Sequence, residues 1–284
     1  MYGQSFEIVY PPANFNGKYM SELTWDIKPL YYYGAYLEFG RIDPMKKTGF
    51  FTSLSFKAGV PGDCGIMEDR DWLSKENSAL THYSGHINRT NEYYSLDADI
   101  GLSVPVFSLF YIKPFISGSW MRFSFTGRDG IIKYARTKGD DVYYPIDDNP
   151  RIGEYPGDNI NYTQNWLVIA AGFSAGKKLP AGFSADLSFK ITPLTYCEAK
   201  DEHLLTNTTF MDYTQFGLFI EPAGKLSYTV NQLEFSCEIV YRKIFDTIGE
   251  SYMGPYGGNQ FSPAGEAGAG LSVVNLNFLV MVHF

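Results

Sequence analysis

Two short clusters of ionisable residues stand out in the sequence, and the first contains a pair of acids. In Met67-Glu68-Asp69-Arg70-Asp71-Trp72, the two aspartates are separated by one residue. In an extended backbone alternate side chains point the same way, so both carboxylates face one side. Like charges this close raise the pKa of at least one carboxyl group unless a cation intervenes. The spacing therefore predicts that Asp69 and Asp71 act together.

The second cluster, Lys200-Asp201-Glu202-His203, has the same spacing between Asp201 and His203. An aspartate that is hydrogen-bonded to a histidine ring fixes its tautomer and makes the other ring nitrogen a better base. The chain has only 4 His, so a histidine beside an aspartate is a notable feature. Together the two clusters could hold and activate a water. That is a hydrolase arrangement that needs neither a metal nor a nucleophilic side chain.

Each cluster alone also has a plainer explanation. An Asp-x-Asp pair in a loop is most often solvated surface or a weak calcium site. An Asp-x-His pair is commonly a surface pair. The catalytic interpretation depends on both clusters lying at the same end of one structure.

The segments that must position these clusters alternate with a period of two residues. The odd positions from Leu23 to Phe39 are mostly apolar or aromatic, whereas the even positions from Glu22 to Glu38 carry four charges. The same alternation recurs in Phe50–Val60, Tyr94–Val104, Leu233–Tyr241 and Val274–Phe284. This pattern predicts long strands, each with one apolar face.

A soluble sandwich or a membrane barrel could bury such strands, and three features favour the barrel. The polar faces carry acids and bases, which suit a hydrated interior. Short connections, near 43–48, 106–109, 178–182 and 231–232, alternate with long ones, as in outer-membrane barrels. The chain also ends on the apolar phase at an aromatic residue, Phe284.

We therefore predict an all-β fold, a ten-stranded antiparallel transmembrane β-barrel with long extracellular loops, in which residues 1–284 form a single outer-membrane domain. The expected strands are 3–10, 18–41, 50–61, 91–105, 110–133, 162–178, 183–199, 210–229, 233–246 and 268–284. The long outer segments are 62–90, 134–161, 200–209 and 247–267. A barrel of this size is only slightly wider than one that side chains fill, so a general diffusion pore is not expected.

The composition restricts the class of protein further. The 22 Tyr and 22 Phe exclude a disordered chain, and no stretch of about 20 apolar residues predicts a membrane-spanning helix. The net charge of −8 argues against nucleic acid as a partner. The 3 Cys lack metal-site spacing, and we expect free thiols. No signal peptide is visible and the first strand is short. Either the chain is a mature form with an added Met1, or its natural start lies upstream.

The alternation creates one difficulty for the second cluster. In the strand expected at 183–199, the odd positions form the apolar face. Without an interruption, Asp201 and His203 would point outward. A bulge near Pro193 must therefore shift the phase.

Four segments that follow one another along the chain carry a family resemblance. They are Met20-Ser21-Glu22-Leu23-Thr24-Trp25, Met67–Trp72, Arg122-Phe123-Ser124-Phe125-Thr126-Gly127-Arg128 and Asp201-Glu202-His203. In this order they resemble stretches of the omptins, outer-membrane endoproteases with ten-stranded barrels. The resemblance implies a peptide hydrolase whose catalytic residues are Asp69, Asp71, Asp201 and His203. His203, oriented by Asp201, would act as general base on a water that the acid pair holds from the opposite wall.

The same resemblance implies substrate-binding residues. Glu7 matches one of two acids in the family's specificity pocket, while the second falls at Ala199, next to Lys200. The family preference for basic residues is therefore not predicted for this chain. Ser84 and His86 match residues that line the cleft, with a structural role in the loop as the alternative.

The resemblance also implies a lipid partner. Arg122 matches one of the basic residues that hold lipopolysaccharide, but other positions of that site fall at Gly118, Trp120, Asn165 and Met211. The binding of another lipid, or of none, is left open. We expect a monomer in the outer membrane that needs no metal or other cofactor, with its active site facing the exterior and a peptide or protein as substrate.

Two alternative functions remain. The first is a non-catalytic adhesin or surface-binding barrel of the same fold. The second, a lipid hydrolase, lacks a Gly-x-Ser-x-Gly motif. His203 favours the peptidase hypothesis over these alternatives, because a binding loop has no need of a base paired with an aspartate.

Overall fold

The computed structural model describes residues 1–12, 18–40, 47–76, 78–106 and 110–283. These residues form seventeen β-strands and one 3₁₀ turn, Pro180–Gly182. No helix within these ranges is long and apolar enough to cross a membrane. The predicted all-β fold is confirmed. Phe284 and parts of the short connections expected at 43–48 and 106–109 lie outside the described residues.

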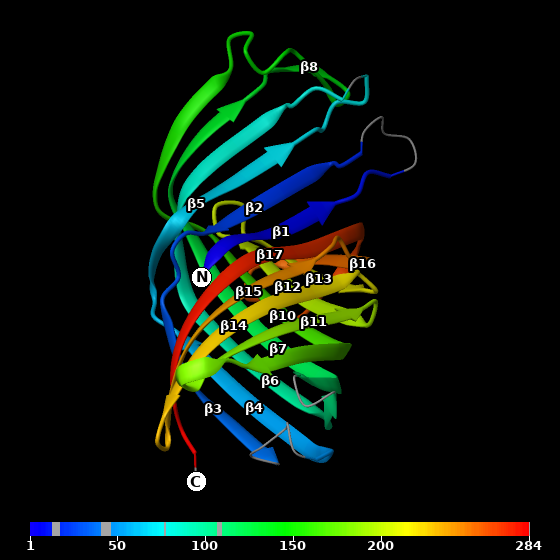
Figure 1. The fold of residues 1–284 in the computed structure, drawn as a ribbon. Helices are drawn as coiled ribbons and strands as arrows, with labels where there is room; N and C mark the ends of the chain where they lie inside the picture. Colours follow the sequence, from blue (N-terminus) through cyan, green and yellow to red (C-terminus); the bar gives the residue numbers. More distant parts are fainter. Residues whose placement is uncertain (13–17, 41–46, 77, 107–109, 284) are drawn as a thin grey trace.

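The part of the barrel wall farther from the C-terminus, which we call the upper part, is a closed cycle of antiparallel strands (Figure 1). Each strand of the cycle pairs with the next. The cycle runs through β1 (Tyr2–Val9), β2 (Ser21–Ile27), β5 (Gly62–Asp71), β6 (His82–Val106), β7 (Phe110–Tyr134), β10 (Arg151–Lys178), β12 (Thr195–His203), β13 (Thr208–Gln215), β16 (Ile248–Pro255), β17 (Ser262–Val282) and back to β1. A closed cycle leaves no unpaired backbone edge. Strands at this level can therefore hold side chains around a central space.

The lower part of the wall shares β6, β7, β10 and β17 and adds five other strands. They are β3 (Tyr32–Gly40), β4 (Gly49–Gly59), β11 (Phe183–Thr192), β14 (Phe219–Val230) and β15 (Leu233–Ile244). Among the described residues β3 pairs with β4 alone, and the Tyr32 hydroxyl connects it to β17 by donating to Asn277 Oδ1 at 2.5 Å. The structure divides the wall into many segments, so the strand count of ten is not confirmed strand for strand.

The faces of the lower strands show which side meets lipid. On β17 the apolar side chains Val274, Leu276 and Phe278 are exposed, whereas Asn275 and Asn277 between them are buried. A soluble sandwich would bury the apolar face instead. Apolar residues outside and polar residues inside are typical of a barrel in a membrane. The alternation read from the sequence therefore has the orientation that the barrel requires.

The strand expected at 18–41 is a correction to the sequence prediction. The structure divides it into β2, which pairs with β1 and β5, and β3, which pairs with β4. Trp25 and Ile27 on β2 are fully buried, whereas Tyr33 and Phe39 on β3 are exposed. The odd positions thus change sides, because the chain leaves one ladder and enters another.

The long outer segments are a second correction. Most of 62–90, 134–161 and 247–267 is strand, because β5, β16 and the first parts of β6, β10 and β17 extend the wall upward. Their ladders satisfy the backbone hydrogen bonds there. The hairpin of β8 (Thr137–Gly139) and β9 (Val142–Tyr143) lies at the top of Figure 1, at the opposite end from the C-terminus.

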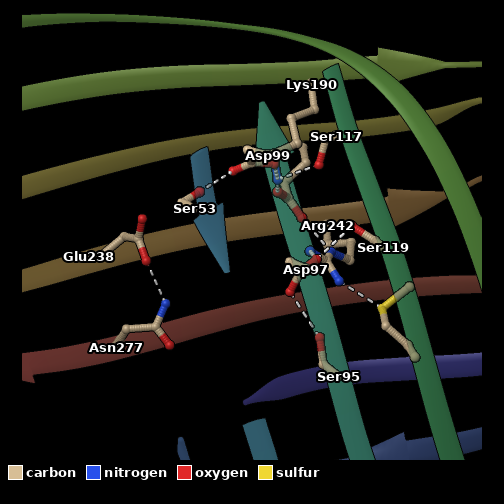
Figure 2. Close-up of polar contacts among 12 residues, drawn as sticks. Ser53, Ser95, Asp97, Asp99, Ser117, Ser119, Lys190, Glu238, Arg242 and Asn277 are labelled. Atoms are coloured by element: carbon tan, nitrogen blue, oxygen red, sulfur yellow. Dashed lines mark hydrogen bonds and ion pairs between the residues drawn. The ribbon is translucent and has the colours of Figure 1, made fainter. Parts of the chain in front are cut away.

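Two layers fill the interior. Aromatic side chains form the upper layer, where Trp25 stacks between Phe125 and Tyr162 at centroid distances of 5.7 and 5.2 Å. The lower layer is an ion network (Figure 2) in which Arg242 on β15 donates to Asp97 Oδ1 on β6 at 2.9 Å and also contacts Glu221 on β14. The acids and bases expected on the inner faces are therefore paired across the lumen.

Candidate active site

The acid pair lies at the end of β5, where the wall rises above the aromatic layer. Asp69 is the register partner of Leu23 on β2 and of Ser84 on β6. Ser21 donates a hydrogen bond from its Oγ to Asp69 Oδ1 at 3.3 Å. Asp71 follows two residues later on the same face. The extended backbone therefore places both carboxylates side by side, as the sequence predicted.

A one-residue bulge turns the second cluster inward. On strand β10, Ala171 is the register partner of Ile191 on β11, and Val168 is the register partner of Thr195 on β12. Between these pairs, two residues of β10 face three residues of the opposing chain, 192–194. The interruption predicted near Pro193 is confirmed. It moves Asp201, which is 2% exposed, to the inner face.

Asp201 and His203 form a close pair at the end of β12. His203 Nε2 lies 2.5 Å from Asp201 Oδ2. The Asp201 side chain is buried, whereas that of His203 is 26% exposed. The buried carboxylate thus anchors a histidine ring that remains accessible from the cleft.

The outer faces of the same strands carry charge. Arg70 pairs with Glu68 at 2.5 Å on β5, and Lys200 pairs with Glu202 at 2.5 Å on β12. Charged side chains that face outward do not fit a lipid-facing surface. The candidate site therefore lies beyond the membrane-spanning part of the wall.

The two clusters lie close enough to act on each other electrostatically. Burial and the neighbouring Asp71 raise the pKa of Asp69 well above its usual value, against the opposing effect of His203. Burial raises the pKa of Asp71 to about 6. Burial alone would lower the pKa of His203, but Asp201, Asp69 and Asp71 together raise it to about 9. The structure therefore brings all four predicted catalytic residues together.

Two further predicted residues lie behind the acid pair. The Oγ of Ser84 is 2.9 Å from His86 Nε2, and His86 Nδ1 is 3.0 Å from Asn159 Oδ1. All three residues are buried. His86 thus has both ring nitrogens occupied by protein partners. Asn159, on β10, was not found from the sequence, because neither its spacing nor its type marks it.

Comparisons with known proteins identify the family of this chain. The sequence model of the Omptin family matches residues 1–284. The chain belongs to the omptin family. This omptin is 24% identical to the plasminogen activator of Yersinia pestis over an alignment of 290 residues. The alignment covers 98% of this chain and 83% of that protein. Its fold is similar to the crystal structure of the outer membrane protease OmpT from Escherichia coli, with a TM-score of 0.83 and 17% identity over 99% of this chain and 93% of that one.

The resemblance seen in the sequence is thereby confirmed. The omptin has the fold of a transmembrane β-barrel. Its family membership supports an outer-membrane protease. Its free cysteines, Cys64, Cys197 and Cys237, match the expectation of free thiols.

A second acid that the sequence did not indicate acts electrostatically on Glu7 in this omptin. Asp212 on β13 is the register partner of Ala199 on β12. Burial, reinforced by Asp201, raises the pKa of Asp212 to about 7, although a hydrogen bond from Ser251 opposes the shift. Burial and the charges of Asp201 and Asp212 also raise the pKa of Glu7 well above its usual value. No local pattern in the sequence marks Asp212, because its place opposite Ala199 follows only from the pairing of β12 with β13.

The remaining predicted site residue lies on the outer wall. Arg122 on β7 donates from Nε to Glu92 at 2.7 Å and from an Nη atom to Asn165 Oδ1 at 3.1 Å. Its guanidinium is thus partly occupied by protein, and lipid binding at Arg122 stays a prediction. Within the described ranges, no group of three or more His, Cys, Asp or Glu side chains could hold a metal ion.

Proposed function

We propose that this omptin is an outer-membrane endopeptidase whose cleft faces the cell exterior. In this proposal Asp201 and His203 activate a water that Asp69 and Asp71 hold from the opposite wall. The observation that carries the proposal is the coupling of the two pairs, since His203 lies 2.5 Å from Asp201 and responds electrostatically to both acids of β5. A non-catalytic binding surface has no need of this coupling.

The number of protons that the four side chains hold suits hydrolysis. Because the acid pair and His203 act on each other electrostatically, the protonation of one is linked to that of the other. With a single shared proton, the site is either an imidazolium facing two carboxylates or a neutral His203 facing a half-protonated acid pair. The second form is reactive, because its neutral ring can accept a proton from the water.

The reaction then runs in two steps. The water oxygen bonds to the peptide carbonyl carbon as His203 takes one of its protons, while the proton on the Asp69–Asp71 pair stabilises the developing oxyanion. In the second step the carbon–nitrogen bond breaks and His203 returns its proton to the leaving amine. The buried Asp201 keeps the ring in orientation throughout.

We also propose that Glu7 and Asp212 line the substrate pocket and bind a cationic side chain. Each carboxyl is 2% exposed, and Glu7 Oε2 and Asp212 Oδ1 have no hydrogen-bond partner among the described residues. Buried carboxyl groups without a partner are costly. A lysine or arginine side chain of the substrate would supply the missing cation, and the small side chain of Ala199 faces Asp212 across the ladder.

The test is a peptide-library digest by refolded protein in lipid, read by mass spectrometry. The unaltered chain is expected to cleave internal peptide bonds, and His203→Ala is expected to lose at least about 10³-fold in rate, as for other enzymes that lose their base. Unchanged cleavage by His203→Ala would remove the mechanism. No cleavage of any peptide by the unaltered chain would instead favour an adhesin of the same fold.

A further inference from the structure

Behind the acid pair, a buried hydrogen-bond chain runs from β10 to β6. It links Asn159 to His86 and His86 to Ser84, at 3.0 and 2.9 Å. Asn159 is 1% exposed, and Ser84 and His86 are each 4% exposed. Ser84 ends the chain directly opposite Asp69, its register partner on β5. Side chains of such partners lie about 5 Å apart at Cβ.

A backbone amide fixes the direction of this chain. The N–H of Gly130 on β7 donates to Asn159 Oδ1 at 2.9 Å. A backbone N–H can only donate, so the side-chain atom that meets it must be the amide oxygen. The same oxygen faces His86 Nδ1, which must therefore carry a hydrogen. The contact is close, since a Cβ at Gly130 would lie 2.4 Å from the His86 ring and 2.7 Å from this oxygen.

The histidine passes this direction on to the serine. Burial lowers the pKa of His86, and the charge of His203 adds to this effect against the hydrogen bond to Asn159, so the ring is neutral near neutral pH. A neutral ring with hydrogen on Nδ1 has a bare Nε2, which only accepts. Ser84 must therefore donate its single hydrogen to His86. Its oxygen keeps a free acceptor position on the face that Ser84 shares with its register partner Asp69.

An acceptor at this position favours one protonation form of its neighbour. The ionisable groups that act on Asp69 are Asp71 on β5, Asp201 and His203 on β12, Glu7 on β1 and Tyr134 on β7. Only the protonated carboxyl of Asp69 can donate to Ser84. A serine that was free to rotate could donate to the ionised carboxylate instead, which would reverse the preference.

We propose that Asn159 is a positioning residue that acts through His86 and Ser84 to keep one proton on the Asp69–Asp71 pair. This inference deepens the proposed function and rests on it, because the reactive form needs that proton on the acid pair and a neutral His203. Asn159 itself contacts neither substrate nor water in this role.

The first test measures the tautomer and needs no activity. Nitrogen NMR of protein labelled with ¹⁵N-histidine, with the His86 signals assigned by loss in His86→Gln, is expected to show hydrogen on Nδ1 and a bare Nε2 near neutral pH. In Asn159→Leu this pattern is expected to change to the other tautomer or a mixture. A bare Nδ1 or a charged ring in the unaltered protein would overturn the proposal, whether or not the protein is a peptidase.

The second test uses the dependence of peptidase activity on pH. Asn159→Leu and Ser84→Ala are each expected to lower kcat about tenfold and to move the acidic limb of the profile to lower pH by about one unit, the effect of one lost hydrogen bond. The double variant is expected to match the single ones, because both changes interrupt one chain. Additive effects, or an acidic limb that does not move, would reduce Asn159 to a structural residue.

A matched control lies on the same strand. Asn161 accepts a hydrogen bond from Thr126 Oγ1 at 2.8 Å and is not part of the hydrogen-bond chain from Asn159 to Ser84. Asn161→Leu is expected to leave the acidic limb in place. Asn159→Ser, a smaller change, provides the measurement if Asn159→Leu fails to fold, and it is expected to shift the limb in the same direction.

Discussion

Asp212 and Ala199 face each other across the β12–β13 ladder, and both are 2% exposed. Ala199 stands where the sequence comparison with omptins expects an acid, and Asp212 supplies a carboxyl from the neighbouring strand. An acid that is lost from one strand can thus be replaced from the strand beside it, because register partners point to the same side of the sheet. Asp212 thereby adds a second carboxyl group, whose charge acts on Glu7, to the proposed substrate pocket.

The first prediction concerns this pocket. Asp212→Asn removes the charge and keeps the shape, so peptides with arginine or lysine in the pocket are expected to lose about 10- to 100-fold in kcat/KM, the usual contribution of a hydrogen bond to a charged group. Peptides with an uncharged residue there are expected to change little. Steady-state kinetics with matched arginine and alanine peptides measure the difference.

A compensating variant provides the control. Adding Ala199→Asp to Asp212→Asn returns a carboxyl to the opposite side of the same ladder. The preference for the arginine peptide is expected to recover at least in part. If both peptides respond equally to Asp212→Asn, the pocket does not select a cation.

The second prediction is a bell-shaped dependence of kcat/KM on pH. Below about 6 the acid pair takes up a further proton, since the pKa of Asp71 is raised to about 6 and that of Asp69 lies well above its usual value. Above about 9 the site loses its last shared proton, in keeping with the pKa of His203. Activity is therefore expected between these limits. A rate that continues to rise with pH above 10 would show that no such proton is needed.

The third prediction separates orientation from charge at the histidine. Asp201→Asn removes the main group that raises the pKa of His203. The alkaline limb of the profile is expected to move to lower pH, and kcat is expected to fall about 10³- to 10⁴-fold because the ring loses its orienting partner. Glu202→Gln, which changes the outward neighbour that pairs with Lys200, serves as the control.

The sequence predicted the grouping of the four candidate catalytic residues because its signal is local. A spacing of two places Asp69 with Asp71, and Asp201 with His203, on one face of any extended segment. The bulge at Pro193 was also predictable, since the apolar phase before it and the acidic cluster after it could not both face correctly without it. The apolar alternation predicted the membrane-spanning strands of the barrel wall because it too is a local pattern.

The sequence could not show features that depend on which strands pair. The change of face between Trp25 and Tyr33 follows from a change of ladder, and no local pattern announces it. Asp212 and Asn159 come to the site across the sheet from their partners, and each looks like an ordinary polar residue in its own strand. Strands above the lipid were missed because their outer faces carry charges and so lack the apolar alternation.

The last prediction concerns the ion network beneath the aromatic layer (Figure 2). Arg242 is buried and donates to Asp97 and Glu221, while Lys190 Nζ donates to Asp99 Oδ1 at 3.2 Å nearby. Arg242→Met keeps much of the volume but leaves Asp97 and Glu221 with one cation fewer. Removing one partner of a buried ion pair typically costs about 3–5 kcal/mol, more than the pair itself contributes.

Arg242→Met is therefore expected to lower the free energy of unfolding by about 3–5 kcal/mol, measured by urea denaturation in lipid vesicles. The triple variant that adds Asp97→Asn and Glu221→Gln is expected to recover most of the loss, because the two carboxylates that Arg242 neutralised are then uncharged, while Lys190 keeps Asp99 as its ionic partner. An Arg242→Met protein as stable as the unaltered one would mean that water enters the lumen and solvates the two carboxylates. The network would then be a hydrated surface and not a buried support for the strands that carry the candidate active site.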